Sequence, residues 1–323
     1  MRCYQHASRP EGPCAFCCKI SAFLGKRHTE SKTLAMQPLT KTQRNSFHAK
    51  GRCAAITKHS AKAEAEIEKL SDVIQDNRKP VIGTLSFPVC RPEGRALRDN
   101  RDIIVAIIRR RQPDLLLCAG WLVAAKRSLA SIKKATQMSK TVVILETSGL
   151  KKVKTVSWRI ENGRSFRMGE QVIKNSKDTT ASCLTCLTSD LANRKFRFCG
   201  RMTILLICGE VTIVKGRNKG VTFRRDSATP LALKSAVRGE RVLILNPTHT
   251  RMGNAGTLKA WRSFLSQSGR VYVSASNWDV GSKRAQRPSK TLHELWHDAK
   301  CKKPSFCSVP QYSFSYREWV LPQ

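Results

Sequence analysis

Short apolar runs alternate with amphipathic stretches between residues 81 and 279. Six of the runs have the length of buried strands and are bounded by turn residues or helices. They are Val81–Phe87, Leu115–Cys118, Val142–Leu145, Ile204–Ile207, Val242–Leu245 and Val271–Ala275. The stretches with helical periodicity are Leu97–Arg111, Ala124–Met138, Leu231–Val237 and Gly256–Ser268. Strands that alternate with helices predict an α/β fold rather than an all-β fold or a helical bundle.

Two local signals divide the chain further. Asn162-Gly163 supplies the positive φ angles of a two-residue turn and predicts a β-hairpin over Trp158–Phe166. Residues 1–78 show little periodicity, apart from an expected helix over Ser60–Ile74, and the pattern changes at Pro80. We therefore expect a basic N-terminal extension over 1–78, disordered or knuckle-like, a core domain over 79–285, and a C-terminal helix and tail over 286–323.

The composition raises the question of a polyanionic partner. The formal net charge is +36, and the excess of lysine and arginine runs along the whole chain. Such a field attracts nucleic acid non-specifically and in a salt-dependent way, so a nucleic-acid-associated protein is one interpretation. Aromatic residues make up only 7% of the chain and do not interleave with the basic ones as single-strand binding needs. A basic surface without a dedicated ligand is the simpler interpretation.

The cysteines and the hydropathy indicate a compartment. No apolar run is long enough to span a bilayer, and Lys19 interrupts the short apolar segment Ala15–Leu24. The chain has 13 cysteines, which without a secretory signal point to a reducing environment. These features predict a cytoplasmic protein with no membrane partner.

One apolar strand runs directly into a cysteine, in Ile204-Leu-Leu-Ile-Cys-Gly-Glu210. A second strand with a proline follows in Val242–Thr248, and a third in Val271–Asn277. Upstream, Pro113–Trp121 is another strand that ends in small residues. Together these segments resemble the carbon–nitrogen hydrolase (nitrilase) superfamily, most specifically in the second half of the core domain. The resemblance implies a four-layer αββα sandwich with Cys208 as the nucleophile.

The resemblance also implies a lysine and a carboxylate. The family's lysine lies on a strand about 35 residues before the cysteine, and Lys174 fits this spacing; Lys177 and Lys195 are alternatives. A lysine stabilises the charge that develops in the tetrahedral intermediate, and a carboxylate accepts the thiol proton.

The carboxylate is where the chain departs from the family's pattern. Ala119 stands where the family has its glutamate, and alanine cannot move a proton. Glu146 and Glu210 are the remaining candidates. The expected activity is hydrolysis of a small amide or nitrile, without a cofactor, by an enzyme that could form a homo-oligomer. A catalytically impaired relative is the alternative.

Two further patterns would place zinc on the chain. His293-Glu294-x-x-His297, if helical, sets two imidazoles on one face beside a glutamate, as in zinc metallopeptidases, with Glu318 as a third ligand. Pairs of cysteine and histidine at knuckle-like spacing lie at Cys3, His6, Cys14, Cys17, Cys183 and Cys186. An amphipathic terminal helix and chance spacing are the alternative interpretations.

Overall fold

The structure is a computed structural model that describes residues 79–90, 95–96, 99–121, 128–147, 155–217, 220–250, 255–279, 292–308 and 314–323. The expected extension over 1–78, the helix over Ser60–Ile74 and the first two cysteine–histidine pairs lie outside the described residues.

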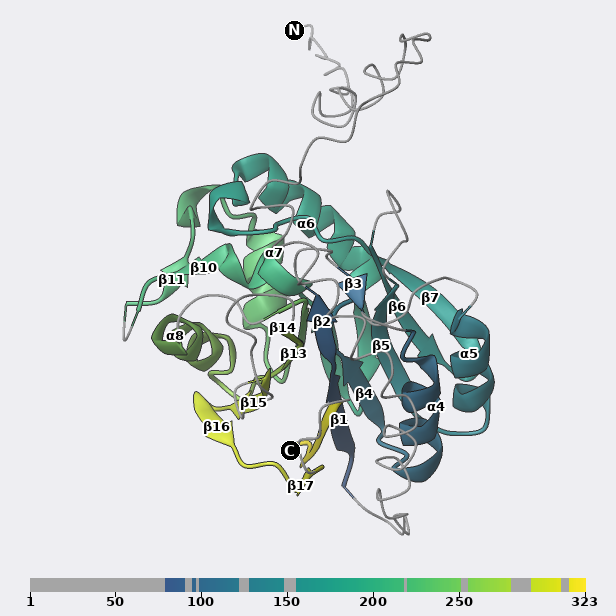
Figure 1. The fold of residues 1–323 in the computed structure, drawn as a ribbon. Coiled ribbons are helices and arrows are strands. Elements are labelled where there is room, and N and C mark those ends of the chain that lie inside the picture. Colours follow the sequence, from purple (N-terminus) through teal and green to yellow (C-terminus); the bar gives the residue numbers. More distant parts are fainter. Residues whose placement is uncertain are drawn as a thin grey trace, which may run out of the picture. The chain divides into compact units, whose positions relative to one another are not determined.

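The described residues form two large mixed sheets (Figure 1). The first has the order β17-β18-β1-β4-β5-β6-β7, and the second has the order β16-β15-β13-β12-β9-β8. Strands of the first sheet are β1 (Val81–Ser86), β4 (Leu115–Cys118), β5 (Val142–Thr147), β6 (Val156–Glu161), β7 (Arg164–Gly169), β17 (Phe306–Cys307) and β18 (Ser315–Val320). Strands of the second are β8 (Lys195–Phe198), β9 (Arg201–Leu205), β12 (Leu243–Thr248), β13 (Val271–Ser276), β15 (His293–His297) and β16 (Lys300–Lys302).

Small sheets and short helices complete the described residues. The small sheets contain β2 (Pro88–Cys90), β3 (Arg95–Ala96), β14 (Trp278–Asp279), β10 (Val214–Lys215) and β11 (Thr222–Phe223). The short 3₁₀ helices are η3 (Ser176–Asp178), η4 (Cys208–Ile213) and η5 (Asp226–Ala228).

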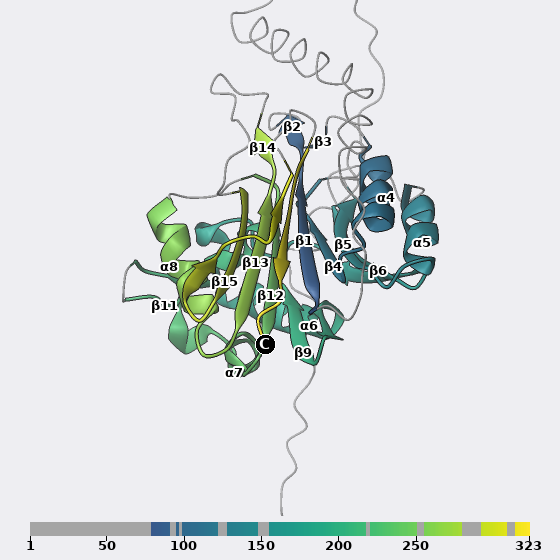
Figure 2. The same cartoon turned by 90° about the horizontal axis from the view of Figure 1, so that it is seen from below.

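Helices cover the outer faces of the two large sheets. The helices are α4 (Arg101–Arg110), α5 (Leu129–Gln137), α6 (Ala181–Arg194), α7 (Leu231–Arg238) and α8 (Ala255–Leu265). Both views place α4 and α5 beyond the first sheet, on the opposite side of the sheets from α7 and α8 (Figures 1 and 2). The layer order is therefore helix, sheet, sheet, helix, which confirms the predicted αββα sandwich.

Three apolar clusters correspond to the three interfaces between these layers. Ile104 of α4 and Leu116 of β4 belong to the first outer cluster. The middle cluster joins the sheets and contains Leu117 of β4 and Leu205 of β9. Leu187 of α6 belongs to the second outer cluster. Because successive side chains of a strand point to opposite faces, one short apolar run fills two clusters at once.

The predicted central elements are confirmed with shifted ends. Each of the six apolar runs contributes to a strand, three in each large sheet. The hairpin is β6 and β7, with Asn162 at φ 47° and Gly163 at φ 72°. The first helix begins at Arg101 rather than Leu97. Helix α6 was not predicted from its Ser-, Thr- and Cys-rich sequence.

The helix expected at His293–His297 is wrong, because these residues form strand β15. Strand β15 pairs antiparallel with β13, and its two faces are used differently. Leu295 lies in the cluster between the sheets, whereas Trp296 lies under the outer helices. A strand that is covered on both faces does not alternate strictly between apolar and polar residues. The order in His293–His297 therefore resembles that of an amphipathic helix. The C-terminal residues thus belong to the sandwich rather than to an appended helix.

In the described part of the chain, no helix is long and apolar enough to cross a membrane.

Candidate active site

Four strands bring their carboxyl ends together in the space between the two large sheets. Strands β4 and β5 are parallel neighbours in the first sheet, and β9 and β12 are parallel neighbours in the second. Side-chain alternation places Leu117 and Ile144 in the middle cluster, so Ala119 and Glu146, two residues further on, face the same space. Cys208 and His249 follow β9 and β12. Ligand sites of open α/β sheets lie at such strand ends.

Glu146 is a buried carboxylate with partners on both oxygens. Its side chain is 1% exposed. Oε2 accepts a hydrogen bond from the backbone N–H of Trp121 at 3.3 Å and lies 2.8 Å from Nε2 of His249. Oε1 accepts a hydrogen bond from the hydroxyl of Ser157 at 3.3 Å. A buried charge needs such partners, and these partners also fix the direction of the carboxylate.

His249 lies between Glu146 and Cys208. Burial alone lowers the pKa of His249, but electrostatic interactions and hydrogen bonds with Glu146 and with Cys208 outweigh burial and raise this pKa to about 10. The indole of Trp121 stacks on the imidazole with ring centroids 4.0 Å apart and an interplanar angle of 10°. The ring is therefore positively charged at neutral pH and held on one face by an aromatic side chain.

Cys208 is the first residue of η4 and is 6% exposed. Its φ angle is 46°, a left-handed conformation that few side chains adopt without compensation. The side-chain amide of Asn246 donates hydrogen bonds to the carbonyls of Leu206 at 2.6 Å and Cys208 at 3.2 Å, which holds this turn against β12. Backbone strain of this kind concentrates at functional sites.

Ala119 and Gly120 provide the space that the cluster occupies. Ala119 carries no acid, as the sequence indicated, and its backbone N–H donates to the carbonyl of Leu85. A Cβ atom built on Gly120 would lie 2.2 Å from Cδ2 of His249 and 2.5 Å from Oε2 of Glu146. Glycine is therefore required at position 120 for the imidazole and the carboxylate to meet.

The other residues proposed from the sequence lie elsewhere. Lys174 is exposed, and only its backbone passes the cysteine turn, since its carbonyl oxygen would be 2.0 Å from a Cβ on Gly209. Glu210 is fully buried and is paired with Arg194, Nη1 to Oε2, at 2.6 Å. It also accepts a hydrogen bond from the backbone N–H of Ile207 at 2.7 Å. Glu210 thus anchors the turn, whereas Glu146 is the carboxylate linked to Cys208 through His249.

His249 is the residue that sequence reasoning missed. The resemblance to the nitrilase superfamily directed attention to lysines before Cys208 and to position 119, where the family has a glutamate and this chain has alanine. The available signal was position: His249 directly follows a buried strand whose pattern predicted a neighbour of the cysteine strand. A titratable side chain at that point is a candidate for the same edge of the sheet.

The proposed zinc ligands are separated by the strand geometry. Residues i and i+4 of a strand lie about 13 Å apart, because each residue advances by about 3.3 Å. His293 is buried and hydrogen-bonds through Nδ1 with Thr84 at 2.8 Å. Glu318 accepts two hydrogen bonds from Arg111, at 2.9 and 2.8 Å. His293, His297 and Glu318 therefore do not form a common site.

Among the described residues, no three histidine, cysteine, aspartate or glutamate side chains are arranged to hold a metal ion. Cys183 and Cys186 lie on α6, where Cys186 is exposed.

Comparison with known proteins returned structural neighbours only. No family model and no curated protein matches the chain. The solved structures include a mutant of the amidase from Nesterenkonia sp. AN1 that shows Michael addition of acrylamide at the active-site cysteine. It is 12% identical with a TM-score of 0.46, and the alignment covers 75% of this chain and 93% of that one. Another mutant of that amidase, described as from the nitrilase superfamily, is 10% identical, with a TM-score of 0.45 and coverage of 77% and 93%.

A further mutant of the same amidase, in complex with butyramide, is 10% identical with a TM-score of 0.45, and the alignment covers 77% of this chain and 94% of that one.

Proposed function

We propose that the chain is a carbon–nitrogen hydrolase in which Cys208 attacks the carbon of a small amide. The observation that carries the proposal is the contact of His249 with both Cys208 and the buried carboxylate of Glu146. A thiol gains its nucleophilic form beside a protonated imidazole, and a third group that orients the imidazole completes the usual arrangement of nucleophile, base and orienting acid.

The chemistry is acyl transfer in two halves. The Cys208 thiolate forms a C–S bond to the carbonyl carbon, and the protonated imidazole of His249 gives its proton to the nitrogen as the C–N bond breaks. The products of this half are a thioester on Cys208 and the free amine or ammonia. Neutral His249 then takes a proton from water while the water oxygen attacks the thioester. The carboxylic acid leaves, and the thiolate and the imidazolium are restored.

In this proposal His249 takes over two tasks that the nitrilase pattern gives to other residues. It replaces the glutamate absent at position 119 as the group that moves protons. Its positive charge also lies at the reacting centre, where the family uses a lysine, while Lys174 remains exposed. Glu146 keeps the imidazole in one orientation and stabilises its charged form, as the buried acid of a catalytic triad does. Ala119 therefore does not by itself imply an impaired enzyme.

The proposed substrate is a small amide. Cys208 is 6% exposed and lies between the sheets, so the reacting group must reach a largely enclosed sulfur. A short aliphatic amide satisfies this requirement, and one of the structural neighbours was obtained in complex with butyramide.

The test is release of ammonia from butyramide and other short amides by the full-length protein. We expect turnover by the wild type and none by Cys208→Ala. His249→Gln should lower kcat by about 10²- to 10⁴-fold, the usual contribution of a general acid–base group. Cys186→Ser, which changes an exposed cysteine of α6, is the matched control and should leave the rate unchanged.

A second readout separates an inactive site from a wrong substrate. Intact-mass kinetics with iodoacetamide at neutral pH should label Cys208 before the other cysteines, and the order should be lost in His249→Gln. If Cys208 reacts no faster than the other cysteines, and no amide is turned over, the proposed nucleophile is wrong.

A further inference from the structure

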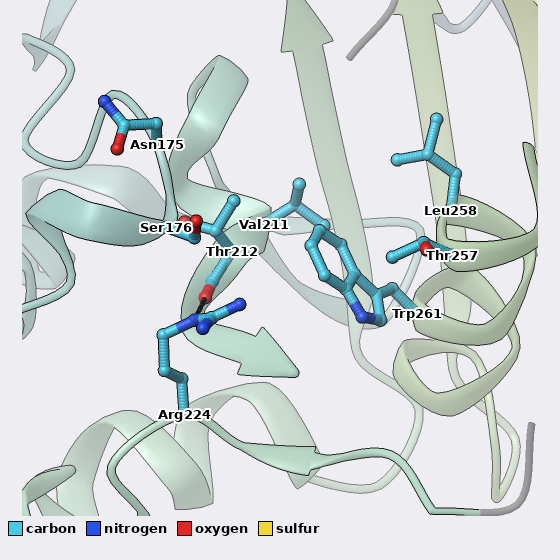
Figure 3. Close-up of a pocket in the computed structure, with 8 residues that line it drawn as sticks. All are labelled: Asn175, Ser176, Val211, Thr212, Arg224, Thr257, Leu258 and Trp261. Atoms are coloured by element: carbon cyan, nitrogen blue, oxygen red, sulfur yellow. Dashed lines mark hydrogen bonds between the residues drawn. The ribbon is translucent and has the colours of Figure 1, made fainter. Parts of the chain in front are cut away.

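A cavity of about 320 Å³ is lined in part by Val211 and Trp261 of the second outer cluster, and neither Glu146 nor His249 lines it. It is bounded by η4, by the segment that contains η3, and by α8 (Figure 3). Its volume is at the lower end of the range of small-molecule sites. The proposed hydrolase chemistry uses none of the side chains that line it.

One wall of the cavity carries a positive charge without an acidic partner among the described residues. The guanidinium of Arg224 is half-buried and donates from Nε to the carbonyl of Thr212 at 3.0 Å, which fixes its position. Burial lowers the pKa of Arg224, as expected for a cation that is partly removed from water and not offset by a carboxylate. Within the described part of the chain, Arg224 forms no ion pair. An anionic ligand would compensate this desolvated charge.

The neighbouring wall is flat and apolar. The indole of Trp261, from α8, lines the same cavity as the Arg224 guanidinium and lies next to Val211 (Figure 3). Its Nε1–H donates to the carbonyl of Gly216 at 3.1 Å, so the ring is held in place. Leu258 extends the apolar surface. A fixed aromatic ring and a fixed guanidinium that line one small cavity match a planar molecule with one anionic group.

We propose that this cavity binds a small organic anion, with its carboxylate or phosphate on Arg224 and a planar apolar body against Trp261. The occupant contacts Val211 and Thr212, which belong to the same 3₁₀ helix that begins at Cys208. The site is independent of the proposed hydrolase activity, and its test is a binding measurement.

The experiment is calorimetric titration of the full-length protein, at physiological ionic strength, with benzoate, phenyl phosphate and the uncharged analogue benzamide. We expect one site for benzoate or phenyl phosphate and none for benzamide. The benzoate and phenyl phosphate arms distinguish a carboxylate from a phosphate ligand. Arg224→Met should weaken binding by at least about tenfold, the usual loss when a charge-assisted hydrogen bond is removed.

The control addresses the high positive charge of the chain. Arg197→Met removes the same charge from an exposed position on β8 and should leave the affinity unchanged. An equal loss in both variants, equal binding of benzamide, or no binding of either anion would overturn the proposal. If Arg224→Met does not fold, the NMR signal of the Trp261 indole N–H in the wild-type protein provides the test. The signal is assigned by its loss in Trp261→Phe. The anions must shift it, and benzamide must not.

Discussion

Glu146 makes the largest electrostatic contribution to the raised pKa of His249. Burial destabilises the protonated form of the imidazole, whereas interactions with Glu146 and with Cys208 stabilise it. Because Glu146 is 1% exposed, water screens its charge little. The backbone of Trp121 and the hydroxyl of Ser157 hold the same carboxylate, so its direction is set before any substrate arrives.

Replacing Glu146 with glutamine should therefore lower the pKa of His249 by roughly one to three units, the usual effect of removing an adjacent opposite charge. The measurement is the NMR titration of the His249 ring, which should move down from about 10. Glu161→Gln, at a partly exposed ion pair with Arg159 of the neighbouring hairpin, is the control and should leave the titration in place. An unchanged midpoint in Glu146→Gln would show that Cys208 alone holds the proton.

Gly120 gives a second test at the same scale. An alanine there places its methyl group within 2.2 Å of the imidazole, so the ring or the strand end must move. We expect Gly120→Ala to abolish rapid labelling of Cys208 and to cost about 1–3 kcal/mol of stability, the usual range for overpacking. Gly220→Ala, whose Cβ would meet only Arg217 O at 3.7 Å among the described residues, should change neither quantity.

At the scale of elements, strands made almost entirely of apolar residues were predicted correctly. Elements that mix apolar and polar residues, such as β15 and α6, were not. The six central runs are nearly pure in apolar residues, so their pattern has one interpretation. Strand β15 alternates between the core, in Leu295, and an ion pair of Glu294 with Arg262 at 2.7 Å. That mixture resembles an amphipathic helix. Cys208 and Glu146 were found by position at strand ends, whereas His249 was not, because the resemblance implied only a lysine and a glutamate as partners of the cysteine.

Strand β18 and the C-terminal end of α4 are joined by a buried ion pair between Glu318 and Arg111, the residue that follows the helix. The pair is bidentate, and the hydroxyl of Tyr316 donates to the same carboxylate at 2.8 Å. Glu318→Gln leaves the guanidinium without its counter-charge and should cost about 3–5 kcal/mol in urea unfolding. Because Glu318 does not share a site with His293 and His297, the zinc content of this variant, measured by elemental analysis, should equal that of the wild type. Glu161→Gln removes a more exposed pair and should cost at most about 1 kcal/mol.

For the whole molecule, two buried histidines set opposite limits of pH stability. Burial, with a contribution from the charge of Arg317, lowers the pKa of His293 to about 3, so the folded protein binds fewer protons there than the unfolded chain below pH 6.5. Stability contributed by neutral His293 is therefore lost as the pH falls from 6.5 toward 3. The raised pKa of His249 acts in the other direction: its contribution is complete below pH 6.5 and is lost as the pH rises toward 10.

Urea unfolding between pH 4 and pH 10 tests this directly. In His249→Gln the stability should fall less steeply than in the wild type on the alkaline side, and the acidic side should be unchanged. In His293→Gln the acidic side alone should flatten. Parallel curves for all three proteins would mean that neither histidine changes its protonation on unfolding.

The pairing of β1 with β18 has a consequence for synthesis on the ribosome. Val81 pairs with Val320, so this edge of β1 stays uncovered until the distant strand β18 has been synthesised. Contacts this distant in sequence slow folding, and an unpaired edge strand invites association with other chains. Nascent chains halted before Ser315 should therefore require a chaperone to stay in solution, and chains extended past Val320 should not.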